Sequence, residues 1–78
     1  MKILFFAHLK DVCGSTEMTL NCDHLNVDGL WGKLIEAHPG LEKFRSSVRI
    51  ARNWEYVGPE AEFKDNDEIA FIPPVSGG

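Results

Sequence analysis

The sequence lacks a cluster of basic residues. Its 78 residues include eight Lys and Arg against twelve Asp and Glu, which gives a formal net charge of −4, and no two basic residues are adjacent. Proteins that bind nucleic acid or an anionic membrane surface usually carry a basic patch. We therefore expect neither nucleic acid nor a membrane among the partners of this chain.

The sequence also lacks a long apolar run. The run near the start, Ile3–Ala7, has five residues, whereas crossing a bilayer takes roughly 20. It is also too short for the core of a signal peptide, and no convincing small-residue cleavage site follows it. These absences predict a cytoplasmic location.

Cysteine is scarce, and potential metal ligands are scattered. Cys13 and Cys22 are the two cysteines of the chain, fewer than small secreted domains usually carry, so we expect both to be reduced thiols. His8, His24 and His38 share no metal-ligand spacing with them or with one another. The sequence therefore predicts no metal site and gives the cysteines no role.

Motifs for catalysis are absent as well. The sequence contains no nucleophile–base motif and no phosphate-binding glycine loop, and the acidic stretch 60–68 does not have the spacing of a calcium loop. A single domain of this size buries only about 60% of the surface that its unfolded chain exposes. It therefore has little core in which to build a deep catalytic cleft.

Helical and strand-like patterns are clear. Asn26 is a good helix N-cap, and apolar residues recur after it at helical spacing until Pro39-Gly40, which predicts one main helix over 27–38. Apolar or alternating runs separated by turn residues predict strands at 2–7, 16–22, 48–53, 55–57 and 68–72.

This order of elements favours an α+β fold of the ubiquitin-like β-grasp type. A mixed sheet of four or five strands would carry the helix on one face, with the first and last strands parallel at its centre. Residues 1–74 would form this domain, and residues 75–78 a flexible, functional Gly-Gly tail. The two central strands are apolar on both faces, so one helix would leave an apolar face open, which usually marks an interface.

The tail follows directly from the last predicted strand. Pro73 and Pro74 cannot continue a strand ladder because they lack the N–H donor. Gly77 and Gly78 have no side chains, so the end of the chain can enter a narrow channel. At about 3.3 Å per residue, the six residues from Pro73 reach about 20 Å. This length suits insertion of a terminal carboxylate into the active site of another protein.

The segment 65–78, Asp-Asn-Asp-Glu-Ile-Ala-Phe-Ile-Pro-Pro-Val-Ser-Gly-Gly, resembles the C-terminal signature of the small subunit of molybdopterin synthase. Segments 3–7, 50–53 and 56–57 resemble other strands of that family, so the resemblance covers nearly the whole chain. Asn66 is a departure, because the family often has Gly there. Asn also tolerates a left-handed backbone, so we expect the turn to persist.

The resemblance implies that the chain is a sulfur carrier. An E1-like activating enzyme would use ATP to adenylate the carboxylate of Gly78, which follows Gly77, and sulfur transfer would convert it to a thiocarboxylate. The thiocarboxylate would then donate sulfur to cyclic pyranopterin monophosphate and so form the molybdopterin dithiolene. The chain would bind no cofactor, and the catalytic groups would lie on the large subunit.

The resemblance also implies where the large subunit binds. Two small and two large subunits would form a heterotetramer, within which the small subunit is not itself catalytic. The residues expected to contact the partner lie on the open sheet face and along the tail: Phe6, Tyr56, Ile72, Pro73, Pro74, Val75 and Ser76.

Two other functions remain open on the sequence. Carriers for thiamine synthesis or tRNA thiolation share the Gly-Gly ending and the β-grasp fold, although Pro-Pro-Val-Ser before it favours the pterin pathway. A ubiquitin-like interaction module with an inert tail would also fit, because chain ends are often polar and rich in glycine.

Overall fold

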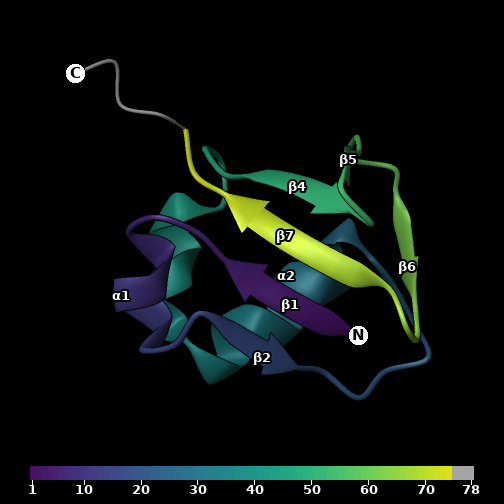
Figure 1. Ribbon diagram of the computed structural model, residues 1–78, viewed down its shortest axis with the longest axis horizontal. Helices are drawn as coiled ribbons and strands as arrows, with labels where there is room; N and C mark the ends of the chain where they lie inside the picture. Colours follow the sequence, from purple (N-terminus) through teal and green to yellow (C-terminus); the bar gives the residue numbers. More distant parts are fainter. Residues whose placement is uncertain (75–78) are drawn as a thin grey trace.

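A five-stranded sheet with a helix across one face forms the body of the protein (Figure 1). The computed structural model describes residues 1–74. Its elements, in chain order, are β1 (Lys2–Phe5), α1 (Leu9–Cys13), β2 (Glu17–Thr19), β3 (His24–Asn26), α2 (Val27–Ala37), the 3₁₀ helix η1 (Pro39–Phe44), β4 (Arg49–Arg52), β5 (Glu55–Tyr56), β6 (Glu62–Lys64) and β7 (Glu68–Ile72).

The strand order of the main sheet is β2-β1-β7-β4-β5. Strands β1 and β7 are parallel and lie side by side, with Ile3 opposite Ile69 and Phe5 opposite Phe71, while the other pairs are antiparallel. The predicted α+β β-grasp arrangement, with the first and last strands parallel at the centre, is therefore confirmed.

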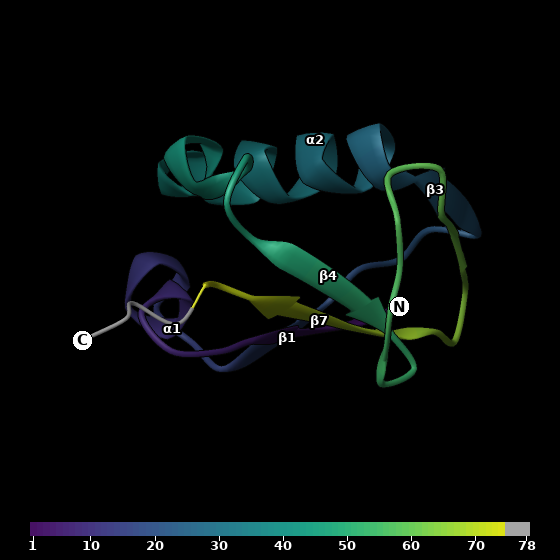
Figure 2. The same ribbon diagram turned by 90° about the horizontal axis from the view of Figure 1, so that it is seen from above.

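Helix α2 begins where the sequence predicts. The side chain of Asn26 accepts a hydrogen bond from the backbone N–H of Gly29 at 2.7 Å, which satisfies one of the unpaired donors of the first turn. The helix ends at Ala37, one residue before the predicted end, and η1 begins at Pro39. Figure 2 shows α2 lying across one face of the sheet.

The core lies between α2 and this inner face of the sheet. Leu30, Trp31 and Leu34 of the helix are buried against inward-pointing residues of the central strands, and the rings of Trp31 and Phe71 meet edge to face at 4.9 Å. Ile3, Phe5, Ile69 and Phe71 are at most 2% exposed. Alternate residues of β1 and β7 therefore supply the floor of the core.

A second, two-stranded sheet was not predicted. Strand β3 pairs with β6 antiparallel, and Leu25 lies opposite Phe63. Each strand has three residues, of which only the middle one turns its apolar side chain inward, so the surrounding polar residues conceal the strand pattern. The strand predicted over 16–22 is also shorter than expected, since only Glu17–Thr19 pairs with β1.

In the part of the chain that the structure describes, the outer face of the main sheet has no helix over it, as the sequence predicts. Leu4 on this face is half-buried and Phe6 is 38% exposed. Ala51 and Ala70 on this same face are buried.

Within residues 1–74, no helix is long and apolar enough to span a membrane.

Candidate functional site

The last strand carries the tail from the centre of the sheet. β7 is paired with β1 on one side and β4 on the other, and the N–H of Phe6 donates to the carbonyl of Phe71 beyond the ladder. Ile72 is half-buried, Pro73 is buried and Pro74 is exposed. β7 therefore ends at Ile72 in the middle of the sheet, and Pro73 and Pro74 lead from it toward the tail that the sequence predicts at 75–78.

The outer face beside this point carries exposed aromatic rings. Phe6, Trp54 and Tyr56 are 38%, 66% and 59% exposed, and they are the large hydrophobic residues exposed within residues 1–74. The rings of Phe6 and Trp54 meet edge to face with centroids 6.5 Å apart. The guanidinium carbon of Arg49 lies 4.7 Å from the centre of the Tyr56 ring. We call Phe6, Arg49, Trp54, Tyr56 and Ile72 the aromatic patch.

Strand register explains why the members of the patch share one face. Arg49 lies opposite Ile72, and Tyr56 lies opposite Ala51. Arg49 and Ala51 are two residues apart in β4, so their side chains leave the same face of the sheet. The patch therefore continues from the end of β7, where the tail begins, to the β4–β5 hairpin.

The predicted partner residues fall into two groups. The structure brings Phe6, Tyr56 and Ile72 to the outer face, as expected, whereas the ring of Pro73 is buried by its own chain and offers little surface. The other predicted positions, Val75, Ser76, Gly77 and Gly78, lie outside the described residues. Contact of any of these residues with a partner stays a prediction.

Sequence reasoning missed Trp54 as part of this surface. The structure places Asn53 and Trp54 in a two-residue hairpin loop, with Arg52 opposite Glu55. The missed signal was a large aromatic residue at a loop position that normally takes Gly or Asn. A tryptophan at a hairpin tip does not pack into the core, so its exposed ring is the feature that marks it as part of this surface.

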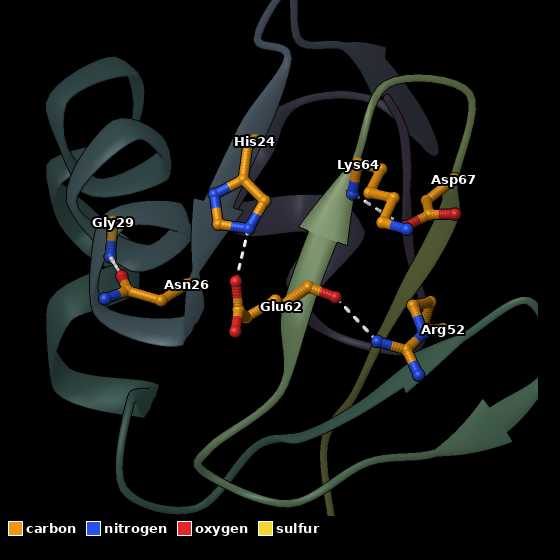
Figure 3. A network of polar contacts seen from close by, with 7 residues as sticks. All are labelled: His24, Asn26, Gly29, Arg52, Glu62, Lys64 and Asp67. Carbon is orange, nitrogen blue, oxygen red and sulfur yellow. Dashed lines mark hydrogen bonds and ion pairs between the residues drawn. The ribbon is translucent and has the colours of Figure 1, made fainter.

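Polar contacts fix this hairpin to the start of β7. The side-chain oxygen of Asn53 accepts from the N–H of Glu68 at 3.0 Å, and its amide nitrogen donates to Asp67 at 3.1 Å. Asp67 also accepts from the backbone N–H of Lys64 at 2.8 Å (Figure 3). That backbone hydrogen bond, more than the one from Asn53, lowers the pKa of the Asp67 carboxyl.

A second candidate location lies beside β3 and β6. An open groove of about 590 Å3 runs between the start of α2 and the segment around β6, with His24, Asp28, Glu60 and Glu62 among its lining residues. His24 and Glu62 join across β3 and β6 (Figure 3). Among residues 1–74, no three His, Cys, Asp or Glu side chains gather as metal ligands would. Among the described residues, no buried side-chain polar atom lacks a hydrogen-bond partner, so the groove holds no unpaired buried group that would indicate a ligand, and the aromatic patch is the stronger site.

Comparison with known proteins decides the family. Residues 3–78 match the model of the ThiS family. The chain belongs to the ThiS family. It is 40% identical over 81 residues to the molybdopterin synthase sulfur carrier subunit of Chlamydomonas reinhardtii, covering 100% of this chain and 98% of that protein. It is 35% identical over 79 residues to the protein of the same name from Arabidopsis thaliana, covering 100% and 82%.

A solved structure agrees with this ThiS-family assignment. The crystal structure of SAMP1 from Haloferax volcanii superimposes with a TM-score of 0.84 at 29% identity, covering 99% of this chain and 97% of that one. The recognised resemblance and the β-grasp fold are thereby confirmed.

Cys13 of this ThiS-family chain offers a poor alternative place for sulfur. Cys13, at the end of α1, is half-buried, and burial raises the pKa of its thiol. A thiol with a raised pKa is protonated at neutral pH, and the thiolate is the form that reacts. The site that the geometry favours is therefore the end of β7, together with the aromatic patch beside it.

Proposed function

We propose that this chain is the sulfur carrier subunit of molybdopterin synthase and that the carboxylate of Gly78 carries the sulfur. The observation that supports this most is the end of β7. A central strand, paired on both sides, leads into Pro73-Pro74 and then the sequence Val-Ser-Gly-Gly, beside an exposed aromatic patch. Relatives 40% and 35% identical over the whole of this chain carry the name of that subunit.

The chemistry begins with activation of the carboxylate. A carboxylate is a poor electrophile, so its oxygen first attacks the α-phosphorus of ATP, releasing pyrophosphate and forming an acyl-adenylate on Gly78. A persulfide of the E1-like activating enzyme then attacks the acyl carbon and displaces AMP, which forms an acyl disulfide. A second thiol of that enzyme attacks the enzyme-side sulfur of this disulfide, which releases the thiocarboxylate of Gly78 and leaves a disulfide on the enzyme. Glycine leaves this carbon open to attack, since it has no side chain.

Sulfur delivery takes place in the active site of the large subunit. The thiocarboxylate sulfur attacks cyclic pyranopterin monophosphate, and hydrolysis of the resulting acyl–sulfur bond returns the carboxylate of Gly78. Two deliveries supply the two sulfurs of the dithiolene. The acid–base groups come from the large subunit, because the tail offers none. We propose two small and two large subunits in the complex, and a cytoplasmic location for it.

A protein modifier is the second candidate function. The superimposed structure from Haloferax volcanii is that of small archaeal modifier protein 1. In that case the activated Gly78 carboxyl would form an amide with a lysine of another protein, instead of receiving sulfur for a pterin.

Intact mass spectrometry separates these functions. The chain is incubated with the activating enzyme of its own organism, ATP and a sulfur donor, and then with the large subunit and cyclic pyranopterin monophosphate. We expect the chain to become about 16 Da heavier, as replacement of one oxygen by sulfur requires, and to return to its first mass as molybdopterin forms. A cysteine persulfide would add about 32 Da instead.

The control is the same chain without Gly78, which should gain no mass and support no molybdopterin. Attachment of the intact chain to lysines of other proteins, without the thiocarboxylate mass, would favour the modifier. A thiocarboxylate that forms but never converts the pterin would point to thiamine synthesis or tRNA thiolation.

A further inference from the structure

The tip of the β4–β5 hairpin holds a tryptophan in an unfavourable backbone conformation. Asn53 and Trp54 both have positive φ, 51° and 70°, as the two central residues of a type I′ hairpin turn require. Glycine adopts this conformation freely at the second position, but a side chain with a Cβ atom destabilises it. Trp54 is 66% exposed, so core packing does not explain the indole at this position.

The tip is also held firmly. Asn53 exchanges two hydrogen bonds with the backbone of Glu68: its own N–H donates to the carbonyl of Glu68 at 2.7 Å, and its side chain accepts from the N–H of Glu68 at 3.0 Å. Asp67 accepts a third bond from the Asn53 amide. An exposed aromatic ring on a fixed support loses little conformational freedom on binding, as tight interfaces require.

The hairpin tip is held at the start of β7, but the Trp54 ring reaches toward the end of that strand. The Trp54 ring contacts Phe6, and Phe6 is hydrogen-bonded to Phe71, three residues before Pro74. Four residues follow Pro74, and four residues span at most about 14 Å. An enzyme that acts on the Gly78 carboxylate must therefore come within about that distance of Pro74. Phe6 and Ile72 are the members of the aromatic patch that lie beside the end of β7.

The aromatic patch also carries a positive charge, which indicates what a partner must place opposite it. Arg49 stacks on Tyr56 and pairs in register with Ile72, so a cation lies among apolar side chains in a chain of net charge −4. A partner that covers this surface removes water from Arg49, and the guanidinium then needs a carboxylate opposite it.

From these observations we propose that Trp54 is the principal anchor through which this chain holds the large subunit. The large subunit receives the indole in an apolar pocket and places a carboxylate against Arg49. This inference rests on the proposed function, because the partner is the enzyme that takes the sulfur from Gly78. Tryptophan and arginine are the residues that most often dominate binding at protein interfaces.

The variant Trp54→Gly tests the anchor, because binding and folding should respond in opposite directions. Glycine suits the positive φ, so the variant should unfold at the same or a higher denaturant concentration than wild type. Its affinity for the large subunit, measured by titration calorimetry with full-length proteins, should fall roughly thirtyfold or more. Asn66→Gly makes the same backbone change at another positive-φ residue, without removing an aromatic ring, and should bind as wild type does.

The outcomes separate this inference from the function beneath it. If wild type binds the large subunit and Trp54→Gly binds it equally well, the anchor is wrong and the sulfur-carrier function stands. If Trp54→Gly changes only self-association of the chain, measured by sedimentation, the patch joins two copies and the proposal is overturned. If wild type does not bind the large subunit, the proposed function is wrong, and so is the proposal that Trp54 anchors this chain to that subunit.

Discussion

The two faces of the main sheet are built from the same strands but have different roles. On the inner face, Phe5 and Phe71 are at most 2% exposed beneath α2. On the outer face, Phe6 and Trp54 remain 38% and 66% exposed. Phe5, the last residue of β1, and Phe6, the residue after it, thus belong to the core and to the surface. Apolar character alone does not tell them apart, because the covering helix lies on one side only (Figure 2).

The difference separates the surface that stabilises the fold from the surface at which we propose that a partner binds. One face supplies the burial that folds the chain, and the other leaves apolar side chains exposed. Substitutions on the inner face should therefore change the free energy of unfolding, whereas substitutions on the outer face should mainly change affinity.

The largest effect expected from this comparison is on stability. Phe71→Ala removes a fully buried ring that contacts both Trp31 and Phe5. We expect the free energy of unfolding, measured by denaturant titration, to fall by about 3–5 kcal/mol.

Phe6→Ala is the matched control on the outer face. It makes the same chemical change one position beyond β1, and the free energy of unfolding should fall by about 1 kcal/mol or less. Its binding to the large subunit should weaken. Equal losses of unfolding free energy in Phe6→Ala and Phe71→Ala would show that the outer face stabilises the fold as much as the inner face does, and would contradict this comparison.

A smaller effect should come from the contacts that hold the outer-face hairpin. The lowered pKa of Asp67 means that its carboxylate stabilises the fold at pH values above the ordinary range of Asp. This stabilisation is lost as the pH falls through the folded-state pKa. The difference in unfolding free energy between wild type and Asp67→Asn should therefore shrink on acidification. A difference that stays constant between neutral pH and pH about 2 would contradict this role of the charge.

Much of the fold could be predicted because its signals are local. The Asn26 cap and the apolar spacing after it fixed α2 to within one residue, and apolar runs located β1 and β7. Strands β3 and β6 could not be found this way. Each has one inward apolar residue, and their pairing joins Leu25 to Phe63 across a long separation in sequence.

The site was predicted in part for a similar reason. The order of Pro73, Pro74 and the glycines is visible in the sequence, and so is the apolar outer face. The place of Trp54 depends on a turn whose backbone brings the indole to Phe6, and tertiary contacts of this kind leave no periodic signal.

The most direct test of the proposed sulfur-carrier function follows the sulfur atom from the chain to the pterin. The chain is loaded with isotopically labelled sulfur by its activating enzyme, purified, and mixed with the large subunit and cyclic pyranopterin monophosphate, and both protein and pterin are then analysed by mass spectrometry. We predict that the label begins on the C-terminal peptide at Gly78 and ends in the dithiolene, with the carboxylate restored. A label on Cys13 or Cys22, or one that stays on Gly78 while unlabelled molybdopterin forms, would contradict it.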